Sequence, residues 1–324
     1  MVCAADKTDL VVLAITAAYG LPMAKPSIRS LTSCAGVADT MGVLTEVDYN
    51  AAKFQKFVRA NNGAIVNYDA MEETKVNHLL HDVRSQLGIN QNELVIASIL
   101  AMMISAGVSH LVLDIPVGAN ARVRSANEAI RIRKQVEYVG DMLGISVDAV
   151  VTDGSEPVGS GIGAVLEARD VLKILQNAAD APIDLREKSL FLAGRVLEFD
   201  PQLRGGQGYA VAKEILESGR AFEAFQKIIS AQGAKQMPEL GQYVREVVAP
   251  YDGVVSAINN VTINKIGVYA GATQCLGSGL DLKKKTGDRV KAGEVLYTIY
   301  SCNAADFDVV SQLVEVDSGY SIDI

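Results

Sequence analysis

The chain has 324 residues, and its 30 Lys and Arg against 38 Asp and Glu give a formal net charge of −8. Hydrophobic residues make up 49% of the sequence, which is enough for a folded core and excludes an intrinsically disordered chain. The negative charge argues against a protein that binds nucleic acid through bulk positive charge, and the length suits about two domains of roughly 150 residues each.

The sequence predicts a cytoplasmic protein that does not cross a membrane. Its longest charge-free apolar stretch, residues 94–109, is shorter than the about 20 residues that a membrane-spanning helix needs. The N-terminus carries no basic-then-apolar secretion signal. The four cysteines form no CxxC or Cys/His motif, so we expect Cys3, Cys34, Cys275 and Cys302 to be reduced. With three histidines and no Trp, neither a His-based metal centre nor a base-stacking platform is expected.

The first third of the chain is predicted to be mainly helical. Its elements, in order, are a helix over 8–20, a loop that becomes a helix near Gly36 within 24–44, a helix over 51–61, a strand over 63–68, an ambiguous stretch over 76–87 and a helix over 92–106. The last helix has apolar residues on most faces, which predicts that it is buried.

Strands and helices then alternate. The predicted order is a strand over 110–118, a helix over 125–142, a strand over 147–151, a Gly-rich loop over 152–163, and helices over 164–178, 185–199, 209–218 and 221–232. Apolar, β-branched strands between amphipathic helices are typical of a parallel sheet that is covered by helices. The sequence therefore predicts an α/β fold with a parallel or mixed sheet.

The composition changes after residue 233. Residues 233–241 are a predicted linker, and short β-branched runs separated by Gly follow from residue 244 onward. The pattern APxxG followed by GDxVxxGxxL resembles the sequence of the paired short strands in the barrel-sandwich domains of biotinyl and lipoyl carriers. The Lys motifs that those carriers modify do not occur, so the run 283–285 is expected to be a solvated strand face and the region a β-rich α+β domain.

A polar loop, KPSIRSLTS over 25–33, combines positive charge with hydroxyl groups. The residues concerned are Lys25, Ser27, Arg29, Ser30, Thr32 and Ser33. Fixed positive charge, hydroxyl donors and exposed N–H groups are what a phosphate needs. A polar surface loop that caps the next helix explains the same residues.

A second candidate is the loop GSGIG over 159–163, which opens a helix. A Gly-rich approach to a helix N-terminus can bind an anion, but the spacing is neither GxGxxG nor a Walker loop. A tight strand-to-helix turn is the alternative, with Glu167 and Arg169 in capping or ion-pair roles. The glycine spacing also argues against a dinucleotide-binding dehydrogenase.

Several segments in chain order carry a family resemblance. They are KPSIRSLTSCAGVADTMGVL (25–44), ASIL (97–100), LVLDIPVGANARV (111–123), TDGSEPVGSGIGAVLEARDVL (152–172) and the stretch from APYDGVVSAINN to GLDLKKKTGD (249–288). Together they resemble the thymidine and pyrimidine nucleoside phosphorylase family, in particular its long branch, which includes the AMP phosphorylases. The resemblance runs from about Lys7 to the C-terminus.

The resemblance implies a pentosyltransferase that splits a pyrimidine nucleoside or a nucleotide with phosphate, giving a free base and a pentose 1-phosphate. It implies an α/β phosphate-binding domain over 1–70 and 107–232, the remnant of a helical base-binding domain over 71–106, and a C-terminal α+β domain over 233–324. It also implies inorganic phosphate as co-substrate, no other cofactor except a monovalent cation, and a homodimer that binds neither nucleic acid nor membrane.

The resemblance assigns roles to individual residues. Lys25 and Ser27 match phosphate-loop positions, and Arg29, Ser30, Thr32 and Ser33 match a substrate-binding segment. Ser98 matches a base-contacting Ser, and Arg122 stands where a substrate-contacting Lys is found. Asn90 stands at the position of an Asp proton donor, and Glu167 matches a Glu that helps to hold the cation.

Other positions depart from the family pattern. Val37 replaces a phosphate-contacting Thr, Met102 replaces a base-contacting Lys, Gly42 replaces a Glu, and the amide of Asn90 cannot act as a proton donor near neutral pH. The family's Gly-rich phosphate loop would precede Lys7, so the resemblance implies an N-terminal truncation that leaves apolar residues of 94–104 partly uncovered and weakens the dimer. The alternative function is therefore a catalytically degenerate or truncated paralogue that acts as a binding or regulatory protein.

Overall fold

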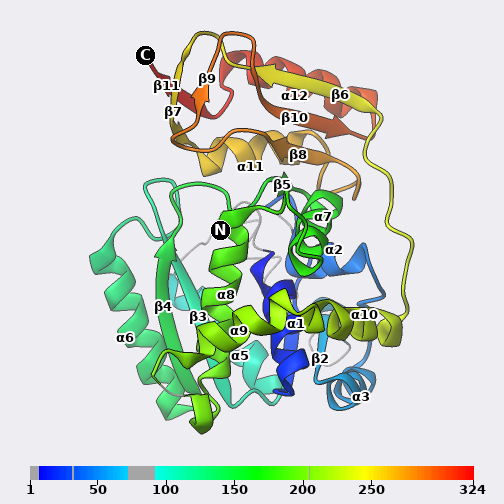
Figure 1. Ribbon diagram of the computed structural model, residues 1–324, viewed down its shortest axis with the longest axis vertical. Coiled ribbons are helices and arrows are strands. Elements are labelled where there is room, and N and C mark those ends of the chain that lie inside the picture. Colours follow the sequence, from blue (N-terminus) through cyan, green and yellow to red (C-terminus); the bar gives the residue numbers. More distant parts are fainter. Residues whose placement is uncertain (1–6, 31–32, 72–91, 204) are drawn as a thin grey trace.

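The structure is a computed structural model that describes residues 7–30, 33–71, 92–203 and 205–324. A body of helices and short parallel strands lies below a β-rich C-terminal region (Figure 1). The body contains, in chain order, α1 (Thr8–Tyr19), β1 (Met23–Ser27), α2 (Val37–Gly42), α3 (Ala51–Asn61), β2 (Gly63–Asn67), α5 (Asn92–Ser105), β3 (His110–Val117), α6 (Ala126–Met142), β4 (Ser146–Asp153), β5 (Gly161–Ile162), α7 (Ala164–Leu175), α8 (Ile183–Leu197), α9 (Gln207–Glu217) and α10 (Arg220–Gln232).

Local sequence explains several of these boundaries. Helix α1 ends at Gly20, whose φ of 102° lies in the left-handed region that glycine adopts without strain. The side chains of Asn50 and Ser125 accept hydrogen bonds from the first turns of α3 and α6. Helix α1 is buried along most of its length and forms the body's main core with α7, α8, α9 and α10.

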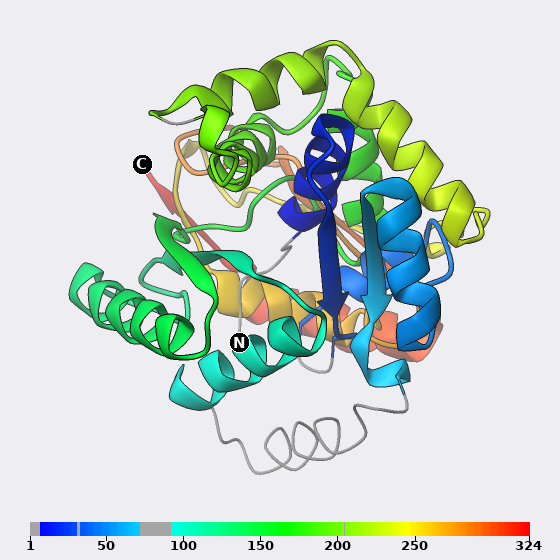
Figure 2. The same cartoon turned by 90° about the horizontal axis from the view of Figure 1, so that it is seen from below.

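Four of the body's strands form two separate parallel pairs (Figure 2). Strand β1 pairs with β2 from Met23 opposite Gly63 to Ser27 opposite Asn67. Strand β3 pairs with β4 from His110 opposite Ser146 to Val117 opposite Asp153. The predicted fold class, parallel strands flanked by helices with a β-rich C-terminal region, is confirmed.

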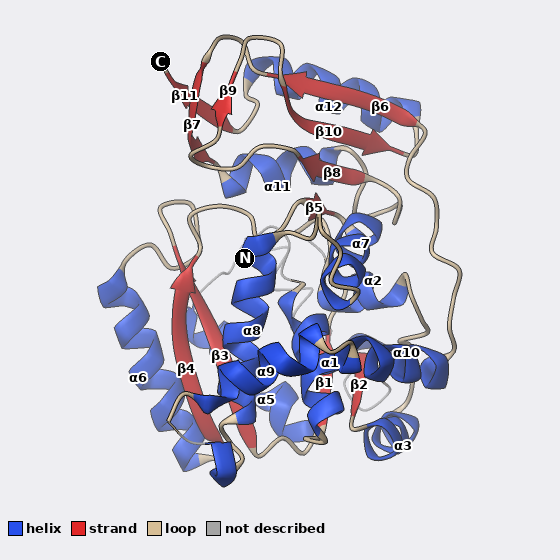
Figure 3. Cartoon of the chain, in the orientation of Figure 1, coloured by secondary structure: helices blue, strands red, loops and turns tan. Residues whose placement is uncertain are grey.

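The C-terminal region contains most of the remaining strands (Figure 3). Its elements are β6 (Tyr243–Val248), β7 (Gly253–Ile258), α11 (Asn260–Tyr269), β8 (Gly279–Leu282), β9 (Arg289–Val290), β10 (Val295–Ser301), α12 (Ala304–Val316) and β11 (Tyr320–Asp323). One sheet has the order β5-β8-β10-β6 and the other β11-β7-β9. Because β5 belongs to the body, Gly161 and Ile162 join the two regions through antiparallel pairing with Asp281 and Leu280.

Two expectations about secondary structure and burial are wrong. The residues at 23–27 form strand β1 rather than a loop. Helix α5 is not buried all round, because Leu94 and Ile104 expose 38% and 41% of their surface. This exposure agrees with the separate expectation of partly uncovered apolar residues in 94–104. The ambiguous stretch 76–87 lies outside the described residues.

The expectation of reduced cysteines is wrong for two of the four. Cys275 and Cys302 form a disulfide with their Cα atoms 6.4 Å apart, and Cys34 is a buried free thiol. The fold brings the segment after α11 beside the end of β10, a proximity that residues 27 apart in sequence do not reveal. In the described part of the chain, no helix is long and apolar enough to cross a membrane.

Candidate functional site

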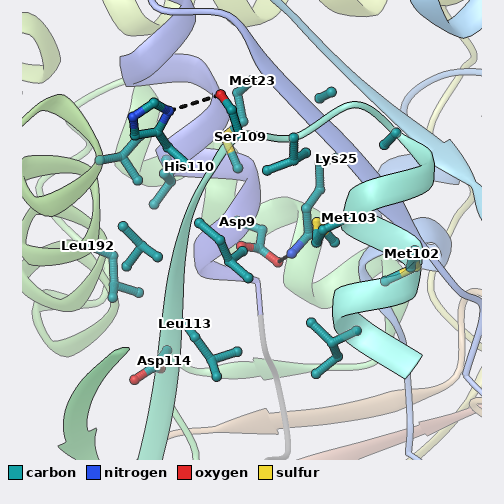
Figure 4. A pocket seen from close by; sticks show the side chains of 18 of the residues that line it. Asp9, Met23, Lys25, Met102, Met103, Ser109, His110, Leu113, Asp114 and Leu192 are labelled. Carbon is teal, nitrogen blue, oxygen red and sulfur yellow. Dashed lines mark hydrogen bonds and ion pairs between the residues drawn. The ribbon is translucent and has the colours of Figure 1, made fainter. Parts of the chain in front are cut away.

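A cavity of about 850 Å³ lies between the two parallel strand pairs (Figure 4). Its walls come from α1, β1, α3, α5, β3 and α8, and most of the lining side chains are apolar. Met102 and Met103 reach it from α5, Leu113 from β3 and Leu192 from α8. A volume of this size and apolar character is typical of a small-molecule site with a few polar groups.

Charged groups stand at defined places in this cavity. On β1, Lys25 places its Nζ 2.7 Å from Oδ2 of Asp9 on α1, and both side chains are about one quarter exposed. Arg122 and Asp114 also line the cavity. Asp114 accepts a hydrogen bond of 2.6 Å from the Thr152 hydroxyl and pairs with Lys188 at 2.7 Å. The cavity thus combines apolar walls with groups of both charges.

The polar loop after β1 is organised around Asp39 of α2. Asp39 accepts hydrogen bonds from the backbone N–H groups of Ser30 and Gly36, at 2.7 and 2.9 Å. Arg29 contacts Asp39 at 3.3 Å and Asp48 at 3.0 Å. Burial opposes the charge of Arg29, but the two carboxylates outweigh it and raise the pKa of the guanidinium. The Ser30 hydroxyl contacts the Ser33 hydroxyl and accepts from the Ser33 N–H.

The Gly-rich loop wraps around a buried ion pair. Lys7 is completely buried, and its Nζ lies 2.7 Å from Oδ2 of Asp170 and 2.5 Å from the Gly161 carbonyl. Asp170 also accepts from the N–H groups of Ser160 and Gly161, at 2.8 and 2.7 Å. Burial opposes ionisation of Asp170, but Lys7 and these N–H groups hold its pKa at about 2. The loop's donors therefore serve carboxylates of the chain itself.

Glu167 is buried at the start of α7. Its two carboxylate oxygens accept from the Thr40 hydroxyl at 3.1 Å and from the Gly163 N–H at 3.2 Å. Within the described ranges, no group of three or more His, Cys, Asp or Glu side chains could hold a metal ion. Each carboxylate oxygen thus accepts from one protein donor, and the role of Glu167 in holding a cation stays a prediction.

The predicted site residues are not gathered in one place. Lys25 and Arg122 line the cavity, together with Met102. Arg29, Ser30 and Ser33 belong to the loop around Asp39, and Ser27 is buried at the end of β1. Ser98 is exposed on α5, where its hydroxyl donates to the Leu94 carbonyl at 2.8 Å. Thr32 and Asn90 lie outside the described residues.

Sequence reasoning did not single out three of the charged groups. Asp9 and Lys7 are ordinary charged residues at the start of a helix, and only the folded chain shows their partners. The sequence did contain a signal that could have identified Asp114. It is the one acidic residue within the apolar run LVLDIPV. An acidic side chain inside a half-buried strand needs a partner, and Lys188 supplies it.

Comparison with known proteins shows what the chain is similar to. The Pyrimidine nucleoside phosphorylase C-terminal domain family matches residues 254–322. A protein named "Putative thymidine phosphorylase" from Rhodopseudomonas palustris is 46% identical over 318 residues, which are 98% of this chain and 62% of the relative. Proteins of the same name from Bradyrhizobium sp. and Methylococcus capsulatus are 44% and 45% identical over 98% of this chain. These matches confirm the resemblance to the thymidine and pyrimidine nucleoside phosphorylase family.

The chain spans about 62% of the length of the phosphorylase relatives that it matches. Among solved structures, the anthranilate phosphoribosyltransferase (TrpD) of Thermus thermophilus is similar, with a TM-score of 0.56 over 69% of this chain and 73% of that one. At 16% sequence identity, this likeness shows a shared fold alone.

Proposed function

We propose that this chain forms part of a pentosyltransferase that carries out the reversible phosphorolysis of a nucleoside or nucleotide. The proposal rests on the 44–46% identity to relatives named as thymidine phosphorylases, together with Lys25 and Arg122 lining one cavity. In this reaction a phosphate oxygen bonds to the anomeric carbon as the bond to the base breaks. The products are a free base and a pentose 1-phosphate.

The cavity supplies groups that suit this chemistry. Apolar walls from α5 and β3 can hold a base and a pentose and exclude water. The positive charges of Lys25 and Arg122 can attract phosphate and stabilise the negative charge that develops on the departing base. Holding phosphate and the anomeric carbon together removes much of the entropic barrier between them.

Phosphate-dependent release of base from thymidine, uridine and AMP tests the proposal. We expect turnover that requires phosphate and that falls about 100-fold or more in Lys25→Met, because a positioned charge is lost. Lys235→Met is the matched control, since Lys235 also pairs with one carboxylate, Glu46, but lies away from the cavity. Folded wild-type protein without turnover on all three substrates contradicts the proposal.

A second function, that of a non-catalytic binding protein, is favoured by the charge pairing in the site. Lys25 is paired with Asp9, Arg29 with Asp39 and Asp48, and Met102 adds an apolar surface. Calorimetry with phosphate and with each nucleoside separates the two functions. Tight binding without turnover supports the binding protein, and Asp9→Asn is then expected to tighten phosphate binding because Lys25 loses its competing carboxylate.

A further inference from the structure

Helix α11 lies at the boundary between the C-terminal region and the body (Figure 1). Its residues Asn260 and Asn264 are four positions apart and therefore lie on the same face of the helix. Both side chains are buried, and each contacts a different loop of the body. One loop is the β1 loop, residues 28–30 and 33–36, and the other is the turn after β4. One helix face thus contacts two loops that are far apart in the sequence.

Cys34 attaches the β1 loop to α11. Its backbone N–H donates to Oδ1 of Asn264 at 3.1 Å, and its thiol donates to the Asn264 carbonyl at 3.3 Å. The thiol also packs against Gly267, where an added Cβ would overlap the Cys34 Sγ atom. A side chain at position 267 would therefore push Cys34 away from the helix.

Hydrogen bonds within the β1 loop connect Cys34 to predicted site residues. Two positions after Cys34, the Gly36 N–H donates to Oδ2 of Asp39, and the same oxygen accepts from the Ser30 N–H. Arg29 pairs with the other carboxylate oxygen of Asp39. A shift of Cys34 therefore moves the groups that hold Arg29 and Ser30 in place.

Asn260 attaches a second loop to the same helix. Its Nδ2 donates to the Gly154 carbonyl at 3.0 Å, and the Gly154 N–H donates to the carbonyl of Val117, the last residue of β3, at 2.9 Å. The β3 turn, residues 118–123, follows directly and contains Arg122, which lines the cavity. Asn260 is completely buried, and within the described ranges its Oδ1 has no hydrogen-bond partner. Burial of an unpaired acceptor costs free energy, so stability alone does not explain an Asn here.

We propose that α11 positions the β1 loop and the β3 turn relative to each other, with Asn260, Asn264 and Gly267 as positioning residues. These loops carry Arg29 and Arg122, so their separation decides whether both cations contact one substrate. The inference rests on the proposed function, because it takes the two loops to hold the substrate. The C-terminal region then controls substrate binding without contacting the substrate itself.

Hydrogen exchange tests whether α11 holds the β1 loop. In Gly267→Ala the added methyl group displaces Cys34, and we expect amides within 33–36 to exchange about tenfold faster or more. The double variant Cys34→Ala with Gly267→Ala makes room for the methyl group, so exchange should return close to that of the wild type. Asn259→Ala is the matched control. It removes the side chain that caps α11 but leaves the contact to Cys34 in place, so exchange within 33–36 should not change.

Three results of this experiment overturn the inference. One is unchanged exchange within 33–36 in Gly267→Ala. Another is equally fast exchange in Asn259→Ala, which would show a general loosening of the helix. The third is a double variant that exchanges as fast as Gly267→Ala alone. If Gly267→Ala does not fold, Asn264→Ala, which removes the acceptor of the Cys34 N–H, takes its place.

The second attachment has a test of its own. Asn260→Leu replaces the amide by an apolar group of similar size and removes the donor to the Gly154 carbonyl. We expect exchange within 118–123 to become about tenfold faster or more, while exchange within 33–36 stays as in the wild type. Equal exchange within 118–123 in this variant and in Asn259→Ala contradicts a role of Asn260 in holding the β3 turn.

Steady-state kinetics separates positioning from stability. In Gly267→Ala we expect the substrate KM to rise about fivefold or more with little change in kcat, because the β1 loop moves while Lys25 stays on β1. KM should recover in the double variant and stay unchanged in Asn259→Ala. Faster exchange with an unchanged KM overturns the positioning role. Wild-type protein without turnover contradicts the proposed phosphorolysis instead, and the Kd for inorganic phosphate, measured by calorimetry, then replaces KM in the same comparison.

Discussion

At the scale of single residues, the charged groups discussed above mostly form ion pairs and hydrogen bonds with one another. Lys7 and Asp170 form a completely buried ion pair, and Arg29 is shared by Asp39 and Asp48. The sequence identified Lys25 and Arg29 as cations, but it could not identify the carboxylates that pair with them. The partners in these pairs lie 10, 19 and 163 residues apart in the chain, and no local pattern encodes them.

Asp170→Asn is expected to destabilise the protein by about 3–5 kcal/mol, because it leaves Lys7 buried without a counter-charge. Asp180→Asn, which removes an exposed carboxylate paired with Lys173, is expected to have a much smaller effect, because solvent screens this pair. Urea unfolding measures both changes. In the double variant Lys7→Met with Asp170→Asn, most of the lost stability is expected to be recovered. A double variant as unstable as Asp170→Asn alone contradicts this account.

The Lys7–Asp170 pair also predicts a pH dependence. The folded-state pKa of Asp170 is about 2, below the ordinary value of 3.8, so its contribution is complete above about pH 4 and is lost as the pH falls towards 2. The depression corresponds to about 2 kcal/mol. We therefore expect the stability difference between wild type and Asp170→Asn to shrink over this range. A difference that stays constant from pH 5 to pH 2 contradicts the assignment.

Thiol counting tests the state of the cysteines. Burial, helped by the negative charge of Glu167, raises the pKa of the Cys34 thiol, so this group is expected to be unreactive in the native protein. In a Cys3→Ser background, an aromatic disulfide reagent should detect no thiol in the native protein and one in denaturant. After reduction in denaturant it should detect three, because Cys275 and Cys302 are then released. Three thiols without reductant contradict the disulfide.

At the scale of elements, the local sequence predicted helices and strands correctly where a single hydrophobic periodicity dominated. Helix α3 and, apart from β5, the order of strands and helices from β3 to α10 follow from periodicity and capping residues. Strand β5 lies within the stretch 152–163, which the sequence predicted to be a loop. Strand β1 was missed because Lys25, Pro26 and Ser27 disfavour a strand. It forms because it pairs with β2, which is buried along its whole length. The burial of α5 was misjudged because an apolar sequence does not show whether a partner covers each face.

The turn between β5 and α7 provides a test at this scale. Gly163 has a φ of 110°, and a Cβ there would lie 2.5 Å from the Ser278 carbonyl oxygen. Gly287 also has a positive φ, 93°, but a Cβ there would meet nothing within 4 Å. Both Gly→Ala variants incur the backbone strain, so we expect Gly163→Ala to lose about 1–3 kcal/mol more than Gly287→Ala in urea unfolding. Equal losses would show that the close approach to Ser278 does not matter.

At the scale of the whole molecule, the body and the C-terminal region are held together by more than the linker. Arg169 of α7 makes two contacts with Asp281 of β8, at 2.9 and 2.6 Å, beside the pairing of β5 with β8. The sequence predicted a change of architecture near residue 233. It could not predict that two residues of the body complete the C-terminal sheet, because this pairing joins segments about 120 residues apart.

Arg169→Lys is expected to weaken this junction by about 1.5–3 kcal/mol, because an ammonium group cannot reproduce two parallel hydrogen bonds to one carboxylate. Arg186→Lys, at a surface position that contacts Glu187 and Glu217, is the matched control. Calorimetry should show a single unfolding transition in the wild type and in the control. It should show a broadened or split transition in Arg169→Lys, and an unchanged transition contradicts a shared junction.

The pairing of β5 with β8 has a consequence for synthesis on the ribosome. Arg169 and β5 are made 112 or more residues before the Asp281 and β8 segments with which they pair. At about 5–20 residues per second, Arg169 is made about 6–22 s before its partner Asp281. During that interval the edge formed by Gly161 and Ile162 has no strand to receive it. The last quarter of the chain therefore acts as the closing step of folding for the first three quarters.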